Sequence, residues 1–316
     1  MVNILVTGCA GFIGSHVCAL LLEKGFGVIG IDNFDPFYNR SVKEENMAKF
    51  KSHPAFSFYE IDITTGLDAV KETDIKAVIH LAAKAGVRPS IEDPAAYIKV
   101  NIVGTQKVHD FMQAREIKKL VFASSSSVYG NNKKMPFSED DNVDNPISPY
   151  AYTKKAGEQM NYTLHHLYNV DVINLRFFTV YGPGQRPDLA IHKFVKAIAN
   201  DQALVLFGDG ETARDYTYVD DTVSGIYNAL QYCLNNTGLY TTINLGNNKP
   251  VKLNELVDII YTEMGKEKKV IYETMQPGDV DITFADISKA GHLLNYKPAT
   301  TMKEGIAKFI DWYKRS

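Results

Sequence analysis

The chain has few of the features that would export it, anchor it in a membrane or cross-link it. Only three cysteines occur among 316 residues, at positions 9, 18 and 233. None stands in the paired spacing of a zinc site, so we expect reduced thiols, a cytoplasmic protein and no metal site. No run of about 18 apolar residues occurs, and the chain begins directly with a strand pattern, so we expect neither a membrane span nor a signal peptide.

The chain also lacks an excess of one charge. It has 34 Lys and Arg against 37 Asp and Glu, a formal net charge of −3, and no local run of basic residues. A nucleic-acid-binding protein presents a basic surface to the phosphates, so we expect no nucleic acid among its partners. With 45% hydrophobic and 22% charged residues, the composition is that of a globular chain that binds small molecules or other subunits.

The first 180 residues alternate short apolar runs with longer amphipathic stretches, which is typical of parallel strands joined by helices. The predicted strands are Asn3-Thr7, Gly27-Asp32, Phe56-Ile61, Ala77-His80, Lys119-Ser124 and Asp171-Phe177. The predicted helices are Ile13-Lys24, Ala95-Arg115 and Pro149-Tyr168. The expected fold class is therefore α/β, a doubly wound parallel sheet of the Rossmann type.

The pattern changes after Arg176, where the chain becomes richer in glycine and proline through residues 181–187. We therefore expect a nucleotide-binding domain over residues 1–180 and a smaller substrate-binding lobe over residues 181–316. The helix pattern Asp220-Leu230 and the strand pattern Tyr240-Leu245 are expected to return to the sheet. The boundary should thus be interleaved, with returning elements near residues 220–246.

Three glycines stand at G-x-x-G-x-x-G spacing between the first predicted strand and the first predicted helix. Glycine permits a tight turn there and lets a pyrophosphate approach the free N–H groups of a helix N-terminus. This strand–turn–helix context predicts a dinucleotide site, whose residues here are Gly8, Gly11, Phe12, Ile13 and Gly14.

Asp32 ends the second predicted strand, eighteen residues after Gly14. A carboxylate at this place accepts hydrogen bonds from both ribose hydroxyls of an adenosine and repels a 2′-phosphate, which favours NAD over NADP. We include Asn33 in the same site. Asp62 and Ile63, after the third strand, could frame the adenine, although an ordinary turn explains them nearly as well.

A serine run, residues 124–127, closes the fifth predicted strand, and Tyr150 and Lys154 lie four residues apart on the following helix pattern. Residues at this spacing share a helix face, so both side chains can point into one cleft. A phenol with a pKa of ~10 is a poor base, but a nearby ammonium group and a positively charged nicotinamide favour its phenolate. We predict Tyr150 as general base, Ser125 as a second ligand of the same substrate oxygen, and Lys154 as a ligand of the nicotinamide ribose.

Together these segments resemble the extended short-chain dehydrogenase/reductase family, and within it the nucleotide-sugar 4-epimerases. The resemblance rests on Thr7 to Gly14, His80 to Ala83, the serine run before Val128-Tyr129-Gly130, the Tyr150/Lys154 pair, Arg214 to Asp221 and Gln276 to Val280. It implies tightly bound NAD, a 4-keto sugar intermediate, and a homodimer formed through the helices Ala95-Arg115 and Pro149-Tyr168. It also implies further cofactor contacts at Leu81, Ala82, Ala83 and Asn101.

Three segments resemble the UDP-glucuronate 4-epimerase branch of that family: Ala85 to Arg88, Arg176 to Pro183, and Arg186 to Asp188. The resemblance implies a UDP-sugar substrate bound through Arg88, with Thr179 and Arg186 near its carboxylate. It further implies Arg214 on the diphosphate and Asp279 on a ribose.

Other members of the family remain as alternatives. Galactose-type epimerases usually carry Asn in place of Thr179, and the 4,6-dehydratases carry an Asp-Glu pair in place of Ser126 and Ser127. Residues 182–188 read Gly-Pro-Gly-Gln-Arg-Pro-Asp, where the glucuronate branch typically reads Gly-Pro-Trp-Gly-Arg-Pro-Asp. The alternatives are a UDP-glucose or UDP-N-acetylglucosamine 4-epimerase, a UDP-glucuronate decarboxylase and a non-catalytic NAD sensor.

Overall fold

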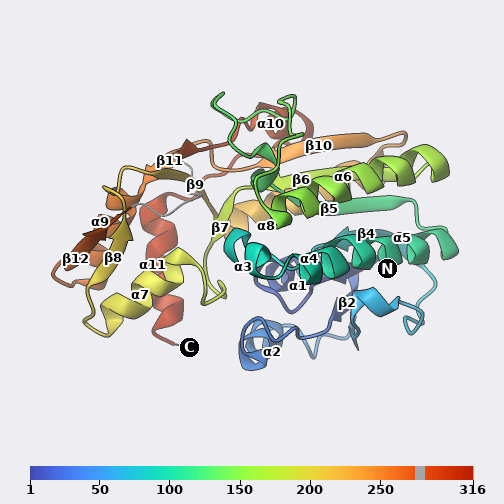
Figure 1. Ribbon diagram of the computed structural model, residues 1–316. Coiled ribbons are helices and arrows are strands. Elements are labelled where there is room, and N and C mark those ends of the chain that lie inside the picture. Colours follow the sequence, from blue (N-terminus) through green and yellow to red (C-terminus); the bar gives the residue numbers. More distant parts are fainter. Residues whose placement is uncertain (275–281, 316) are drawn as a thin grey trace.

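A seven-stranded parallel sheet forms the centre of the molecule (Figure 1). The computed structural model describes residues 1–274 and 282–315. The strand order is β10-β6-β5-β4-β1-β2-β3. The strands are β1 (Asn3–Thr7), β2 (Gly27–Asp32), β3 (Phe56–Glu60), β4 (Ile75–His80), β5 (Lys119–Ser125), β6 (Asp171–Phe177) and β10 (Tyr240–Leu245). The order reverses beside β1, the arrangement of a doubly wound Rossmann-type sheet, as the sequence predicts.

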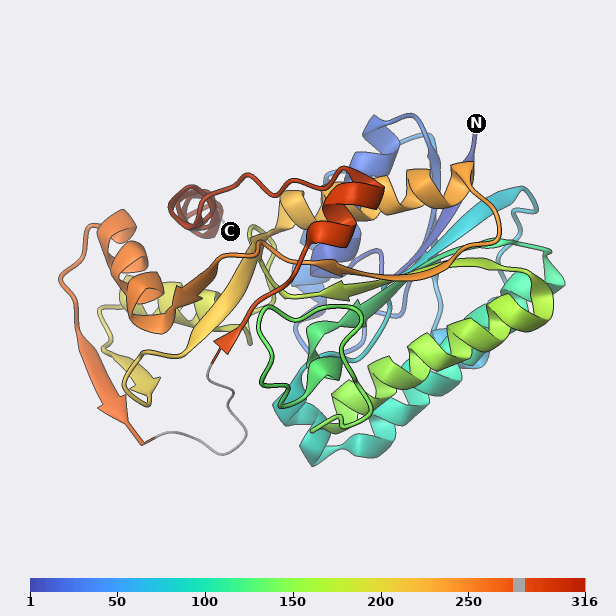
Figure 2. The same ribbon diagram turned by 90° about the horizontal axis from the view of Figure 1, so that it is seen from above.

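Helices cover both faces of this sheet, because successive strand residues point to opposite sides. Ile4 and Val6 of β1 pack with α1 (Phe12–Glu23) and α8 (Val219–Asn235), whereas Leu5 packs with α5 (Thr105–Ala114) and α6 (Pro149–Tyr168). Figure 2 shows α6 running beside α4 (Pro94–Ile98) and α5 on one face of the sheet. The remaining helices of this part are α2 (Arg40–Ala48) and α3 (Val87–Glu92).

One predicted helix differs in detail. The stretch predicted as a single helix over Ala95-Arg115 consists of α4, a π-helical turn over Lys99–Gly104 and α5. A π-turn carries one extra residue per turn, and such turns are frequent at functional sites. The other predicted strands and helices agree with the structure to within two residues at each end, apart from α8, which extends to Asn235.

The elements after β6 build a second group beside the carboxyl ends of the sheet, on the left of Figure 1. Its strands are β7 (Thr179–Tyr181), β8 (Leu204–Phe207), β9 (Ala213–Tyr218), β11 (Pro250–Lys252), β12 (Val270–Glu273) and β13 (Ile282–Thr283). Its helices are α7 (Ala190–Ala199), α9 (Leu253–Met264) and α11 (Met302–Tyr313). The short helix α10 (Ser288–Leu294) packs instead against α8 and β10 of the main sheet. The chain re-enters the main sheet between these elements, since β10 pairs in parallel with β6.

Within the described ranges, no helix is long and apolar enough to cross a membrane. The same residues contain no cluster of three His, Cys, Asp or Glu side chains that could hold a metal ion.

Candidate functional site

A cavity of about 490 Å³ lies along the carboxyl ends of β1, β2, β4, β5 and β6. Most of the residues predicted for the site line it: Gly8, Gly11, Phe12, Ile13, Gly14, Asp32, Asn33, Asp62, Ile63, Leu81, Ala82, Ala83, Ser125, Tyr150, Lys154, Thr179 and Arg186. This is the place where open parallel sheets bind ligands, because the loops after the strands diverge there.

The turn between β1 and α1 is packed too tightly for side chains at two of its glycines. Gly8 has a φ of +75°, and a Cβ on Gly14 would lie 2.0 Å from the carbonyl oxygen of Gly8. No side chain caps the N-terminus of α1, whose N-cap residue is Gly11. The first turn of the helix therefore presents backbone N–H groups to the cavity, as a bound pyrophosphate requires.

Asp32 is held rigidly at the end of β2. Its carboxylate accepts hydrogen bonds from the backbone N–H groups of Ala10 at 3.2 Å and Phe34 at 2.8 Å. The buried amine of Lys43 lies 3.5 Å from the same carboxylate and also lines the cavity. The sequence does not indicate Lys43 as a site residue, because an isolated lysine in a helix of ordinary composition carries no signal.

Asp62 has a local structural role that is visible in the fold. It caps the short 3₁₀ turn Ile63–Thr65 by accepting a hydrogen bond from the backbone N–H of Thr64 at 2.9 Å. The carboxylate also faces the cavity. Turn formation and adenine contact are thus compatible at this residue, and its cofactor role stays a prediction.

The start of α6 brings Tyr150 and Lys154 to the end of β5. Ser148 caps this helix by accepting from the N–H of Ala151 at 3.1 Å, so Tyr150 lies in its first turn. One turn later, Lys154 Nζ donates to the carbonyl oxygen of Ala123 at 2.7 Å and lies 6.0 Å from the ring centre of Tyr150. The spacing of four residues therefore places both side chains on the cavity side, as predicted.

Burial shifts the pKa values of both groups. Desolvation raises the pKa of the Tyr150 phenol, while a hydrogen bond with Ser125 and the positive charge of Arg186 act in the opposite direction. Burial alone lowers the pKa of the Lys154 amine to about 7. Tyr150 is therefore a neutral phenol at neutral pH in the ligand-free protein, and an added positive charge in the cavity would favour its phenolate.

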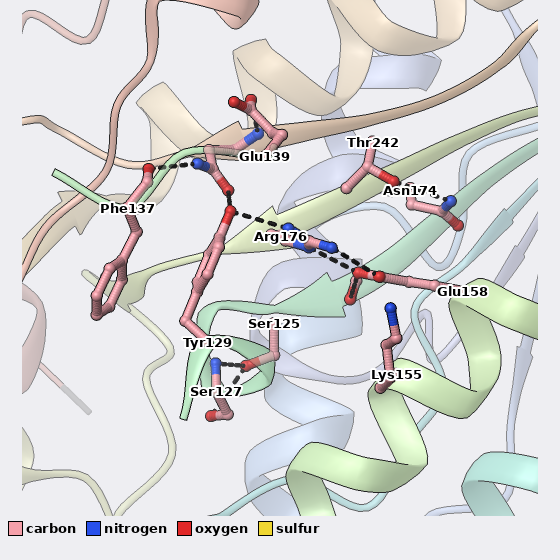
Figure 3. Close-up of polar contacts among 12 residues, drawn as sticks. Ser125, Ser127, Tyr129, Phe137, Glu139, Lys155, Glu158, Asn174, Arg176 and Thr242 are labelled. Atoms are coloured by element: carbon pink, nitrogen blue, oxygen red, sulfur yellow. Dashed lines mark hydrogen bonds and ion pairs between the residues drawn. The ribbon is translucent and has the colours of Figure 1, made fainter. Parts of the chain in front are cut away.

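A buried polar network lies beside the serine turn (Figure 3). Glu158, one turn after Lys154, accepts from Ser124 Oγ at 2.6 Å and pairs with Arg176 at 2.8 and 2.9 Å. Arg176 also donates to the hydroxyl of Tyr129 at 3.0 Å. Ser125 itself caps the turn by accepting from the N–H of Ser127 at 3.2 Å. The network joins α6, β6 and the serine turn, so it fixes Ser125 relative to Tyr150 and Lys154.

The predicted carboxylate ligands lie on the other side of the cavity. Thr179 begins β7, and Arg186 follows the glycine-rich turn after that strand. The guanidinium of Arg186 is paired with the carboxylate of Asp188 and lies 5.3 Å from the ring centre of Phe37. Asp188 belongs to the same sequence motif as Arg186, but the motif does not indicate that the two side chains pair.

Asn101 is buried in the π-helical turn, and it is not among the residues that line the cavity. Its amide oxygen accepts from the N–H of Lys84 at 2.8 Å, and its amide nitrogen donates to the carbonyl oxygen of Lys84 and to Thr153 Oγ1, both at 3.0 Å. Asn101 therefore ties the segment after β4 to α6. Its predicted contact with the cofactor stays a prediction.

The remaining predicted substrate residues lie elsewhere. Arg88 is on α3 and Arg214 is on β9, and neither is among the residues that line the cavity. Arg214 Nη1 donates to the carbonyl oxygen of Ala213 at 3.0 Å. Asp279 lies outside the described residues. The roles of these three residues stay predictions.

Comparison with known proteins gives consistent results. A family model described as GDP-mannose 4,6 dehydratase matches residues 5–309. A UDP-glucuronate 4-epimerase of Thermodesulfobacterium geofontis is 44% identical over 316 residues, which cover 99% of this chain and 96% of that protein. Among solved structures, a UDP-glucuronic acid 4-epimerase from Bacillus cereus in complex with UDP-glucuronic acid and NAD superposes with a TM-score of 0.91, at 35% identity and 99% coverage of both chains.

A UDP-N-acetylglucosamine 4-epimerase from Methanobrevibacter ruminantium M1, in complex with UDP-N-acetylmuramic acid, superposes with a TM-score of 0.89 at 32% identity, covering 99% of this chain and 98% of that one. The agreement in sequence and fold extends over nearly the whole chain. The chain belongs to the GDP-mannose 4,6-dehydratase family of extended short-chain dehydrogenases/reductases.

Proposed function

We propose that this protein is an NAD-dependent UDP-glucuronate 4-epimerase, which interconverts UDP-glucuronate and UDP-galacturonate. One observation carries the proposal: Tyr150, Lys154 and Ser125 line the same cavity as Thr179 and Arg186. An oxidising site and a carboxylate-binding site are thus combined in one chamber. The relatives named as UDP-glucuronate 4-epimerases support the same substrate.

The residues that line the cavity fit NAD. The glycine turn and the first turn of α1 would hold the pyrophosphate, because side chains at Gly8 and Gly14 would collide with the backbone nearby. Asp32 would accept from the adenosine ribose, and its carboxylate would repel a 2′-phosphate. When bound, NAD supplies an acceptor for the hydride of C4 and later returns that hydride.

The chain's own residues would then move the proton. Tyr150 takes the proton of the C4 hydroxyl as base, Ser125 holds the same oxygen, and Lys154 stabilises the phenolate by its charge. Loss of a hydride and a proton leaves a planar 4-keto sugar, which has no configuration at C4. Return of both to the opposite face, after the sugar has turned about its link to the diphosphate, gives the epimer.

The fate of the keto sugar favours an epimerase over the two related activities. A 4-keto hexuronate is a β-keto acid, which loses carbon dioxide when its carboxylate bond stands perpendicular to the carbonyl plane. Arg186 and Thr179 would hold the carboxylate away from that geometry. Ser126 and Ser127 occupy the place of the acidic pair of the 4,6-dehydratases, so the chain lacks the acid that water elimination needs.

Different parts of the chain would bind the cofactor and the substrate. We propose that residues 1–180, with the returning elements near 220–246, bind NAD, and that residues 181–316 mainly bind the UDP-sugar through Arg214 and Asp279, with Arg88 contributing from α3. The three buried, unpaired cysteines support a cytoplasmic location.

We further propose a homodimer formed through the helices Ala95-Arg115 and Pro149-Tyr168, which correspond to α4, α5 and α6, with the neighbouring α3 beside them. Large apolar side chains are exposed along these helices. On the surface of a monomeric protein, such side chains are usually scattered singly. The exposed side chains here are Ile91, Ile98, Val103, Tyr162 and Leu167, with exposed fractions between 41% and 60%.

Proton NMR of the products tests the proposed function. The purified protein is incubated separately with UDP-glucuronate, UDP-glucose and UDP-N-acetylglucosamine. Formation of UDP-galacturonate from the first substrate alone is expected. Conversion of only the neutral sugars would identify a neutral-sugar epimerase instead, and release of UDP-xylose from UDP-glucuronate would identify a decarboxylase.

A further inference from the structure

Arg186 already holds a carboxylate in the ligand-free protein. Its Nε and Nη2 donate to the two oxygens of Asp188 at 3.0 and 2.9 Å, the parallel two-bond arrangement that guanidinium forms with any carboxylate. The side chains of Arg186 and Asp188 are 17% and 34% exposed, so the pair is only partly screened by solvent. Asp188 is therefore paired with the guanidinium group that, in the proposed function, binds the substrate carboxylate.

The ion pair between Arg186 and Asp188 lies close to the reacting groups. Its guanidinium lines the cavity, and its charge reaches the phenol of Tyr150. Phe37 lies against it at 5.3 Å from the ring centre, which leaves the guanidinium edges for hydrogen bonding. Two of the five N–H donors of Arg186 are used by Asp188.

An incoming uronate carboxylate meets Asp188 on either edge of the guanidinium. On the Nε–Nη2 edge it must displace Asp188, and on the other edge it lies near a second negative charge that already neutralises Arg186. Both arrangements weaken the attraction between Arg186 and the sugar. A neutral hexose meets no such competition, because it carries no charge to exchange.

We propose that Asp188 is a specificity-determining residue whose carboxylate competes with the hexuronate carboxylate for Arg186, which keeps the hold of Arg186 on the sugar reversible. This inference rests on the proposed function. A reversible hold matches the chemistry, since the keto sugar must turn inside the cavity between loss and return of the hydride. Asp188 thus lowers the affinity for the sugar carboxylate and leaves the sugar free to turn.

The test compares Asp188→Asn with the wild-type protein by calorimetric titration with UDP-glucuronate and UDP-glucose. Removing the competing charge should tighten binding of UDP-glucuronate by about 3- to 10-fold, a part of the strength of one charge-assisted hydrogen bond, and leave UDP-glucose within about twofold. In turnover, KM and kcat for UDP-glucuronate should both fall, because the sugar is held more firmly.

Two further variants separate this role from simple loss of structure. Asp201→Asn removes a carboxylate from an exposed pair with Lys266 at 2.7 Å and should change neither affinity. In an Arg186→Ala background, Asp188→Asn should tighten UDP-glucuronate binding by less than it does in the wild type, since the group under competition is gone and only charge repulsion remains.

Weaker or unchanged binding of UDP-glucuronate by Asp188→Asn would overturn the inference and assign Asp188 to orienting Arg186. Tighter binding with an unchanged kcat would overturn the link to turning of the sugar. Failure of the proposed function is distinguishable, because it shows as wild-type protein that binds UDP-glucuronate without epimerising it, and the binding comparison still decides the role of Asp188.

Discussion

Lys154 shows how a single buried side chain connects stability with chemistry. The residue is 5% exposed, and its amine donates a hydrogen bond to a neutral group, the carbonyl oxygen of Ala123. Burial of a charged amine without a counter-ion costs free energy, so its pKa falls to about 7 from an ordinary value of 10.5. This lowered pKa lies beside the phenol of Tyr150, where the protonated form of Lys154 would stabilise a phenolate.

The pKa of Lys154 predicts a dependence of stability on pH. Between pH 7 and 10.5 the unfolded chain holds a proton on this lysine that the folded chain has released, so stability rises with pH in that window. Lys154→Met removes this contribution. In the cofactor-free protein, the free energy of unfolding of wild type relative to Lys154→Met should rise by about 1.4 kcal/mol per pH unit from pH 7.5 to 9. A difference that is independent of pH, measured by urea unfolding, would contradict a lowered pKa.

At the residue scale, the sequence predicts which residues lie at the site better than it predicts which side chains pair with them. Tyr150, Lys154 and Asp32 are found from spacing and from their places at element ends. The partners of Arg186 and Asp32 are different, because Asp188 and Lys43 reach them through side-chain conformations that no spacing encodes. The partners of Asn101 are equally hard to predict. Its side chain hydrogen-bonds to Lys84 from a π-helical turn that the residue pattern does not indicate.

The elements around the site are joined by the ion pair of Glu158 on α6 with Arg176 on β6. These residues are 4% and 3% exposed, so each charge depends on the other. Glu158→Gln leaves Arg176 buried without a counter-ion and should lower the free energy of unfolding by about 3–5 kcal/mol. Urea unfolding measures this loss.

The matched control is Glu211→Gln, which breaks a solvent-exposed pair with Lys252 at 2.6 Å and should leave stability nearly unchanged. Equal effects of the two substitutions would show that the buried pair does not tie α6 to β6.

The tight packing of the turn between β1 and α1 makes NAD binding and stability sensitive to a side chain at Gly14. Gly14→Ala places a Cβ 2.0 Å from the carbonyl oxygen of Gly8, which forces the turn and the helix apart. The variant should be purified with little or no NAD and should lose about 1–3 kcal/mol of stability. NAD released by denaturation is quantified by absorbance.

The control substitution is Gly291→Ala, on α10. The nearest atom to the added Cβ is 3.8 Å away, an ordinary contact. This variant should keep its NAD and gain about 0.5–1 kcal/mol, because alanine loses less conformational freedom in a helix. Full NAD content in Gly14→Ala would refute the assignment of the glycine turn as the pyrophosphate cradle.

Element boundaries in the sheet are predictable because each strand is an apolar run bounded by turn residues. Strands β1, β2, β6 and β10 are predicted to the residue, including the return of β10 to the sheet. The second group of elements is not predictable in this way, since its strands are short. Three of them, β7, β11 and β13, pair with β9 in a four-stranded sheet, and β8 pairs with β12 in a separate two-stranded sheet. Such pairing depends on contacts between residues far apart in the chain.

At the scale of the whole molecule, the exposed apolar residues on α4 and α6 predict a subunit interface. Ile98→Glu combined with Leu167→Glu places charges on side chains that are 41% and 59% exposed. The double variant should sediment as a monomer at micromolar concentration, where the wild type should sediment as a dimer. Ile271→Glu, on β12 in the second group of elements, should remain dimeric. A monomeric wild type would refute the interface.

In the proposed reaction, C4 is oxidised and then reduced within one cavity, by a hydride that never exchanges with water. UDP-glucuronate carrying deuterium at C4 tests this directly when it is incubated with the wild-type protein in ordinary water and the product is examined by NMR. We expect UDP-galacturonate with its deuterium retained at C4. Product with hydrogen from the solvent at C4 would contradict it, because epimerisation would then proceed by removal of a proton from carbon.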